Sequence, residues 1–290
     1  FESWTPGQNI IVSKNENYYK HVPKIDKIIF KIVPDENARA LQVKSGELDL
    51  AWLNAQNTKK FRNDDNFSVY DFTTADYRAI APNFNSPFWQ KHSELMSVLG
   101  YALDKQAIID ATLGGQGEIA YSPIQLNSIY NNPNINHYDY NPELFAQKMK
   151  ALGWQKGSDG IYEKNGERLS FSVDVRENEE ERIDIANVAS QQFKNAGVEM
   201  KVNIVQKLDW NTLEAFLIGQ AAPFDPDNGT YVLFVNNASG NYTHYNNPQA
   251  DKYLIQAREE LDINKRKLAY ANFQKEWADN PAYIMIAYLK

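Results

Sequence analysis

Residues 28–49 of the chain read IIFKIVPDENARALQVKSGELD, and this stretch decides the fold class. Its apolar opening predicts a strand over 26–33. Asp35 follows, and its carboxylate can accept the free N–H groups of a first helical turn, which predicts a helix over 37–44. Alternating apolar and polar residues then predict a second strand over 48–52. A strand, a helix and a strand in succession indicate an α/β protein.

The same periodicities predict elements on both sides of this stretch. Strands are expected over 9–13, 67–72, 77–84, 198–205 and 282–289, with a hairpin over 161–175 that turns at Asn165-Gly166. Helices are expected over 58–62, 93–113 with a new cap at Asp104, 142–152, 179–195, 210–216, 248–261 and 263–277. Residues 225–229, DPDNG, are expected to form a tight turn.

The composition narrows the class of protein. The 290 residues are 43% hydrophobic and 23% charged, close to an ordinary globular protein and enough for one or two domains. The formal net charge of -7 disfavours a nucleic-acid partner, whose phosphates attract basic surfaces. No apolar run approaches the roughly 18 residues of a membrane span. Because the chain opens in mid-pattern at Phe1, we expect a piece of a longer protein.

Motifs for metals, cofactors and covalent catalysis are missing from the sequence. There is no cysteine, and the four histidines are not spaced as metal ligands. The glycine loop at 114–117 follows a helix, so it matches neither the Walker A motif nor the dinucleotide fingerprint. No GxSxG motif is present, and Asp225 and Asp227 share one turn, which is poor geometry for the opposed carboxylates of a glycosidase. We therefore expect no cofactor, no metal site and no enzymatic activity.

Several stretches resemble one known family. Residues 28–49 are similar to the strand, the PD–xxAR helix and the SGE(I/L)D signature of the family 5 solute-binding proteins, the dipeptide, oligopeptide and nickel receptors of ABC importers. Residues 100–109, GYALDKQAII, resemble the AxDKxxII helix of the same family. Shorter likenesses near Trp4, at 224–228 and at 242–248 follow in the family's order. The resemblance extends over nearly the whole chain.

The resemblance implies a two-lobe fold of the periplasmic-binding-protein type, with an extra domain inserted in the first lobe. Residues 1–78 would be part of lobe one and residues 85–283 the second lobe, with hinge strands at 79–84 and 284–290. It also implies capture of a short peptide by lobe closure and delivery to the membrane permease subunits of an ABC transporter. The expected location is extracytoplasmic, in the periplasm or as a cell-surface lipoprotein, and the expected state is a monomer.

Arg176 is the candidate that would bind the carboxylate end of a peptide. It is expected at a strand end, ten residues before Ala186. By the resemblance, this is where dipeptide receptors of the family place a carboxylate-binding arginine. A guanidinium suits this role because it matches a carboxylate through two parallel hydrogen bonds. The alternative is a surface arginine that faces Glu179 and Glu180.

Where the family binds the ammonium end of a peptide, this sequence departs from the family pattern. Related receptors carry an aspartate a few residues before the DPD turn, but residues 219–224 contain no carboxylate. Either Asp225 or Asp227 takes this role, or the ligand has no free ammonium there. Both carboxylates could instead cap the backbone of their own turn.

Three aromatic residues, Tyr121, Trp210 and Tyr242, are candidates for lining the ligand cleft, because aromatic side chains give contact area to varied ligands. Since 13% of the chain is aromatic, each could instead belong to the core. Other functions stay open: a receptor for a nickel chelate or another small polar solute, and, in a different class, a glycoside hydrolase or an adhesion or signalling module.

Overall fold

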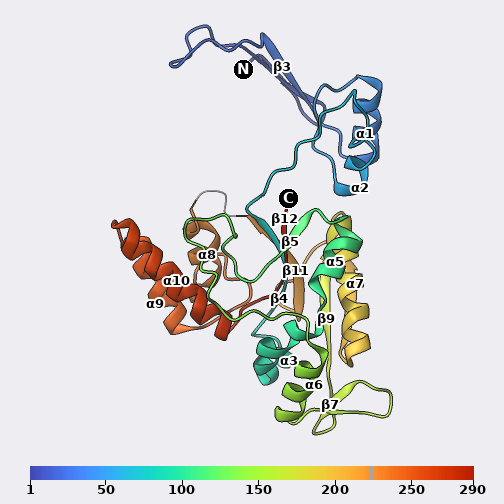
Figure 1. Cartoon of the computed structure of the whole chain (residues 1–290), viewed down its shortest axis with the longest axis vertical. Coiled ribbons are helices and arrows are strands. Elements are labelled where there is room, and N and C mark those ends of the chain that lie inside the picture. The colour runs from blue at the N-terminus through green and yellow to red at the C-terminus, as the bar shows by residue number, and fades with distance from the viewer. Residues whose placement is uncertain (222–224) are drawn as a thin grey trace. The chain divides into compact units, whose positions relative to one another are not determined.

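The structure, a computed structural model, describes residues 1–221 and 225–290. The chain divides into two compact units, Phe1–Tyr70 and Asp71–Lys290 (Figure 1). The first unit contains a three-stranded antiparallel sheet in the order β1–β2–β3. Its elements are β1 (Ser3–Thr5), β2 (Asn9–Ser13), β3 (Lys27–Lys31), α1 (Glu36–Ser45) and α2 (Ala55–Thr58).

The ends of helix α1 show why the sequence predicts it. Asp35 Oδ1 accepts a hydrogen bond from the backbone N–H of Ala38 at 2.7 Å, which satisfies a free donor of the first turn. Gly46 ends the helix with a φ of 78°, a left-handed conformation that glycine adopts without strain. The helix expected over 58–62 begins earlier, at α2, because Asn54 caps the N–H of Asn57 at 2.9 Å.

Two expected strands, 48–52 and 67–72, do not form. A strand needs a neighbour that exchanges backbone hydrogen bonds with it, and side-chain alternation alone does not supply one. Within the described residues, no strand pairs with either segment. Leu50 and Trp52 are 86% and 68% exposed, so the apolar side of the alternation at 48–52 faces solvent rather than a core.

The second unit is built on a six-stranded mixed sheet in the order β10–β9–β11–β4–β12–β5 (Figure 1). Strands β10, β9 and β11 are parallel, β4 runs antiparallel to both β11 and β12, and β12 is antiparallel to β5. The bounds are β4 (Asp76–Pro82), β5 (Gly117–Ile119), β9 (Ser170–Arg176), β10 (Glu199–Val205), β11 (Ala215–Ala221) and β12 (Ile284–Leu289).

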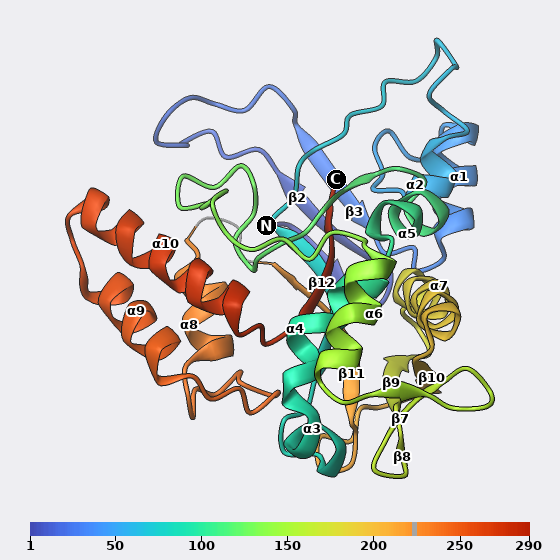
Figure 2. The same ribbon diagram turned by 60° about the horizontal axis from the view of Figure 1, so that its bottom comes forward.

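Helices cover both faces of this sheet (Figures 1 and 2). On β4, Ile80 packs into one hydrophobic core while Ala79 and Ala81 pack into the other, as the two-residue period of a strand requires. The first core is completed by α3 (Pro87–His92), α4 (Met96–Leu99), α5 (Lys105–Thr112), α6 (Pro142–Ala151) and α7 (Glu180–Ala196). The second is completed by α8 (Asp227–Phe234), α9 (Pro248–Glu259) and α10 (Ile263–Asp279). None of the helices in the described ranges is long and apolar enough to cross a membrane.

Two local signals in the second unit are confirmed. The helical region expected over 93–113 forms in pieces, with the short turns η1 (Ser93–Leu95) and η2 (Gly100–Ala102) on either side of α4. Asp104 restarts it by accepting a hydrogen bond from Ala107 N at 2.9 Å.

The second confirmed signal is the hairpin turn at Asn165-Gly166, whose φ angles are 54° and 79°. It joins β7 (Tyr162–Lys164) to β8 (Glu167–Arg168), with β6 (Gln155–Lys156) beside β7. Strand β9 then leaves this hairpin and pairs with β10 and β11 instead.

Two predictions around β11 are wrong. The sequence predicts a helix over 210–216, but β11 begins at Ala215 and pairs with β9 and β4. This pairing overrides the helical pattern at 215–216, because the first four residues of β11 become buried between neighbouring strands. The tight turn expected over 225–229 is instead the start of α8: Asp225 accepts a hydrogen bond from Asp227 N at 3.0 Å, and the helix continues from there. A local side-chain cap of this kind precedes a turn or a helix equally well.

Candidate functional site

The carboxyl ends of the parallel strands β9, β10 and β11 lie at one edge of the sheet, where ligands of open α/β sheets bind. Arg176 is the last residue of β9, as expected. Its Nη1 lies 3.5 Å from Glu179 Oε1, and the side chain is 45% exposed. Arg176 is therefore held only loosely by its partner, and its guanidinium remains accessible to another carboxylate.

Two further arginines meet at the same edge, and the sequence did not single them out. Gly219 on β11 pairs with Arg78 on β4, and Arg182 reaches this point from the first turn of α7. A Cβ at Gly219 would lie 2.4 Å from Arg182 Nη2 and 2.6 Å from Arg78 Nη1. A side chain at this position would therefore require at least one of the two guanidinium groups to shift.

The buried one of these arginines is compensated by carboxylates. Arg78 is 7% exposed. Its Nε donates to Glu181 Oε1 at 2.6 Å, and its Nη1 lies 2.8 Å from Asp76 Oδ1. Burial opposes the charge, but the two carboxylates hold the pKa of Arg78 above its usual value. The available signal was a charged residue inside an apolar strand, which is rare unless it is paired.

Asp225 already has an arginine partner. Arg266 on α10 donates to both carboxylate oxygens, Nη1 to Oδ2 at 2.7 Å and Nη2 to Oδ1 at 2.8 Å. Partial burial works against the charge of Asp225, but these hydrogen bonds hold its pKa below the usual range. The Arg266 guanidinium also lies 5.3 Å and 5.4 Å from the ring centroids of Tyr130 and Tyr270. A ligand ammonium at Asp225 would have to share the carboxylate with Arg266.

Asp227 is paired in a similar way at the first turn of α8. Arg258 Nη2 lies 2.6 Å from Asp227 Oδ2, and its guanidinium carbon lies 3.3 Å from the centre of the Tyr231 ring. Residues 222–224 lie outside the described part of the chain. They include Phe224 of the family-like DPD segment and half of the stretch in which related receptors carry an aspartate.

Trp210 and Tyr242 stack on each other, with ring centroids 4.6 Å apart and an interplanar angle of 24°. Trp210 also packs edge-on against Phe216, at the start of β11. Phe216 pairs with Ala81, whereas Gly219 pairs with Arg78 three positions further along. The aromatic pair therefore lies toward the amino end of β11, and the arginines lie toward its carboxyl end.

Tyr121 follows β5 and stacks flat on His137, with centroids 3.7 Å apart and an interplanar angle of 6°. Lys105 Nζ lies 5.4 Å from the centre of the same ring. Burial, together with the nearby Asp139 carboxylate, raises the pKa of Tyr121 to about 12. Tyr121 thus belongs to an aromatic and basic cluster of its own.

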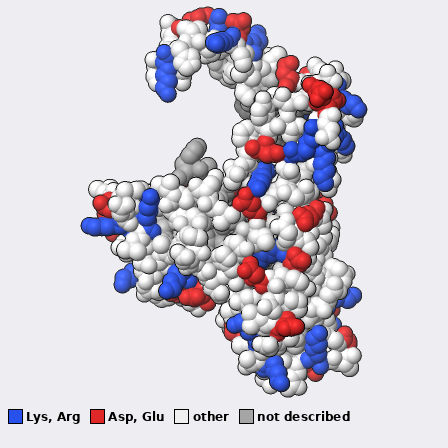
Figure 3. Space-filling model, in the orientation of Figure 1, with Lys and Arg blue, Asp and Glu red and all other residues white. Residues whose placement is uncertain are grey.

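The six residues predicted from the sequence therefore lie in separate groups, with Trp210 and Tyr242 as one stacked pair and the two aspartates joined by a hydrogen bond. Across the described chain, no hydrogen bond or ion pair links Arg176 to either aspartate. No group of three or more potential ligands in the described ranges could hold a metal ion. Charges of both signs are interspersed on the face drawn in Figure 3.

Over residues 1–252 the chain matches the family model of the bacterial extracellular solute-binding proteins, family 5 Middle. The chain belongs to this family. Among curated relatives, this family 5 chain is 27% identical over 306 residues to the oligopeptide-binding protein AppA of Bacillus subtilis, with 99% of the chain and 55% of AppA covered. It is 28% identical over 300 residues to protein XP55 of Streptomyces lividans, with 99% and 54% covered. The chain spans about half the length of the curated relatives it matches.

Solved structures show the same relationship. NikZ from Campylobacter jejuni in complex with Ni(L-His) matches with a TM-score of 0.87 and 29% identity, over 99% of this chain and 59% of NikZ. AppA from Bacillus subtilis in complex with a nonapeptide matches with a TM-score of 0.81 and 27% identity, over 100% and 60%. The predicted α/β fold of the periplasmic-binding-protein class is confirmed.

Proposed function

We propose that this family 5 chain is the solute-binding component of an ABC importer that captures short peptides and delivers them to membrane permease subunits. The observation that carries the proposal is the likeness to AppA over the whole chain, in sequence and in a structure that contains a nonapeptide. The family description supports an extracytoplasmic location. Because the relatives are named for binding, we propose that the protein binds its solute without chemical change.

Within this proposal, Arg176 binds the peptide carboxylate. It ends a parallel strand at the edge where such sheets bind ligands, and its present partner Glu179 is 3.5 Å away and shared with Arg182. An exposed ion pair of this kind contributes little to stability, so exchanging Glu179 for a ligand carboxylate costs little. Strands β4 and β12 are then the proposed crossings between a first lobe at 1–78 and a second at 85–283, and closure of the lobes buries the ligand.

Native mass spectrometry of the full-length protein, purified without denaturation, tests the function. A bound peptide is expected, and the free protein should gain thermal stability when that peptide is added back. Absence of any bound peptide, together with no stabilisation by a peptide library, would overturn the proposal.

The role of Arg176 is tested by calorimetry on the peptide found in this way. Arg176→Ala should weaken binding about 10–100-fold, the effect of losing a charge-assisted bidentate contact. Arg168→Ala is the matched control, since Arg168 is 43% exposed and also pairs with a carboxylate, Glu199, but lies on the β8 hairpin. Unchanged affinity in Arg176→Ala would remove Arg176 from the site.

A receptor for a nickel chelate is the second candidate, because the NikZ structure that contains Ni(L-His) matches with a higher TM-score than AppA. The same thermal measurement separates the two candidates. Stabilisation by Ni(L-His) without stabilisation by any peptide would favour the chelate.

A further inference from the structure

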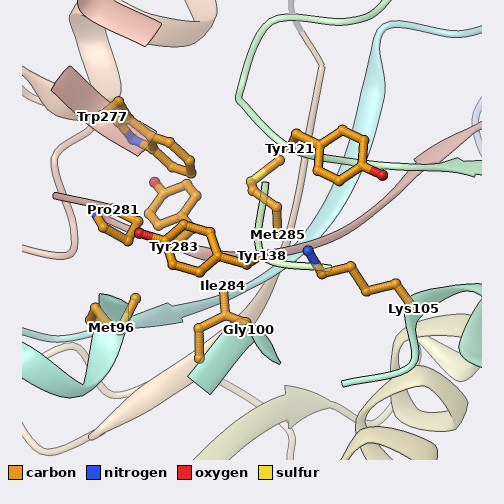
Figure 4. A pocket seen from close by; sticks show the side chains of 10 residues that line it. All are labelled: Met96, Gly100, Lys105, Tyr121, Tyr138, Trp277, Pro281, Tyr283, Ile284 and Met285. Carbon is orange, nitrogen blue, oxygen red and sulfur yellow. The ribbon is translucent and has the colours of Figure 1, made fainter. Parts of the chain in front are cut away.

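Arg176 is open to a solute, whereas the small pocket drawn in Figure 4 is not. Figure 4 shows Lys105 and Tyr121 among the side chains that line this pocket, whose volume is about 10 Å³, the space for one water-sized group. Arg176, in contrast, is 45% exposed at the carboxyl end of β9. A solute carboxylate can therefore reach Arg176, and the neighbours of this arginine decide whether its guanidinium is free to bind.

Glu179 lies between two arginines and is bonded to one of them. Its Oε1 accepts a hydrogen bond from Arg182 Nη1 at 2.6 Å, whereas Arg176 Nη1 lies 3.5 Å from the same oxygen. Backbone hydrogen bonds set this spacing, since Glu179 N donates to Arg176 O at 3.1 Å and Arg182 N donates to Glu179 O at 2.9 Å. Among the described residues, no other carboxylate forms an ion pair with either arginine.

The pair of Glu179 with Arg182 is the better shielded of the two. The side chains of Glu179 and Arg182 are 20% and 23% exposed, against 45% for Arg176. Water and salt screen a partly buried ion pair less than an exposed one, and a short charge-assisted hydrogen bond is stronger than a longer contact. Glu179 is therefore held by Arg182, which leaves Arg176 with the weaker contact.

Arg78 cannot replace Arg182 in this role. The two guanidiniums flank Gly219, but Arg78 already pairs with Glu181 at 2.6 Å and with Asp76 at 2.8 Å. Without Arg182, the cation left within reach of Glu179 in the described chain is Arg176. A partly buried carboxylate is costly when it has no partner, so Glu179 would then close on Arg176.

We propose that Arg182 is a positioning residue of the solute site, which holds Glu179 away from Arg176 and so keeps the Arg176 guanidinium available for the solute carboxylate. This inference rests on the proposed function, because it takes Arg176 as the carboxylate-binding group. Glu179 is the internal competitor of the solute, and Arg182 determines how strongly it competes.

Crystal structures of the solute-free wild type and of Arg182→Met, both as the full-length protein, test the position of Glu179 without any solute. Methionine keeps an unbranched apolar stem beside Gly219 and removes every donor, and the part-exposed position should tolerate it. In Arg182→Met the Glu179 carboxylate should move to about 3 Å from the Arg176 guanidinium. A Glu179 that stays as far from Arg176 as in the wild type would overturn the proposal.

Calorimetry measures the consequence for binding. The probe is the peptide recovered from the wild type by native mass spectrometry, synthesised with a free terminal carboxylate. Arg182→Met should weaken its binding about 5–10-fold, between the effect of an exposed ion pair and that of a charge-assisted hydrogen bond. In a Glu179→Gln background the same change should have less than about a twofold effect, because the competing carboxylate is gone. An equal loss in both backgrounds, or no loss in either, would exclude the positioning role.

Two further variants separate positioning from packing. Arg182→Lys should restore most of the affinity, because one ammonium donor suffices for the single oxygen that Arg182 contacts. Arg168→Met is the matched control, since it removes an arginine paired with Glu199 at the amino end of β10, and it should leave the affinity unchanged. A wild type that binds no peptide would overturn the proposed function, and the solute-free structures would still decide the position of Glu179.

Discussion

The two units of the chain differ in what happens to their apolar residues. In Phe1–Tyr70 the buried hydrophobic residues are Ala40 and Phe61, whereas Asp71–Lys290 contains two extended cores. Strand β3 is exposed along its whole length, although its three central residues, 28–30, are apolar. Strand β12, which is apolar throughout, is buried at five of its six positions. Apolar pattern therefore predicts that a strand forms, and the layers packed against the strand determine whether it is buried.

The largest expected effect tests this difference directly. Phe273→Ala removes a fully buried ring from the second core and should cost about 3–5 kcal/mol of unfolding free energy. Phe30→Ala removes a ring on β3 that is 54% exposed and should change stability by about 0.5 kcal/mol or less. Urea unfolding measures both. A large cost for Phe30→Ala would show that β3 is covered in solution and would break the comparison.

A buried charge also distinguishes the two units, because the first unit contains no charged side chain as deeply buried as Lys105 in the second. The folded-state pKa of Lys105, about 8, lies below its usual value of 10.5. The unfolded chain therefore binds more protons between these values, and stability relative to Lys105→Met should rise by about 2–3 kcal/mol as pH increases from about 8 to 10.5.

Urea titrations of the wild type and Lys105→Met across this pH range measure the effect. The tyrosines whose pKa is raised, such as Tyr138 at about 12, act in the opposite direction above pH 10, but they are common to both proteins and cancel in the difference. Parallel pH profiles for the two proteins would contradict the prediction.

The next largest change in stability is expected at two glycines, one in each unit. Gly219→Ala in the second unit places a methyl group against two guanidiniums and should cost about 1–3 kcal/mol through overpacking. Gly46→Ala in the first unit meets nothing within 4 Å, so its cost is only that of the left-handed φ, about 1 kcal/mol. Thermal unfolding of both variants measures the difference. Arg182→Ala should relieve the strain of Gly219→Ala if the contact with Arg182 causes it.

The smallest effect compares two helix caps. Asp35→Ala removes the cap of α1, and Asn247→Ala removes the cap of α9, whose side chain accepts from Gln249 N and Ala250 N. Each should cost about 0.5–2 kcal/mol. Hydrogen exchange should show faster exchange across all of α1 after Asp35→Ala. In α9 the acceleration should be confined to the first turn, because Leu254 and Ala257 hold the helix in the second core.

The position of Arg176 at a strand end could be predicted from the sequence, but the grouping of the candidate residues could not. Arg176 was predicted at a strand end and lies there. The pairing of Asp225 with Arg266, 41 positions away, could not be predicted, because nothing local to either residue encodes the approach of α10 to α8. Lys105 lay inside a recognised motif, yet its burial depends on aromatic residues from distant segments of the chain.

The sequence by itself determined the local elements and the family: Asp35 and Asp104 cap helices, Asn165-Gly166 turns a hairpin, and the family signature spans 28–49. These features depend on hydrogen bonds and backbone angles within a few residues, which neighbouring side chains decide.

Tertiary structure alone decided the rest. It placed β11 between β9 and β4 where a helix was expected, left 48–52 without a partner, and brought Arg78 and Arg182 together over Gly219. Strand pairing and burial are contacts between residues far apart in the chain, so their energy does not appear in any local pattern.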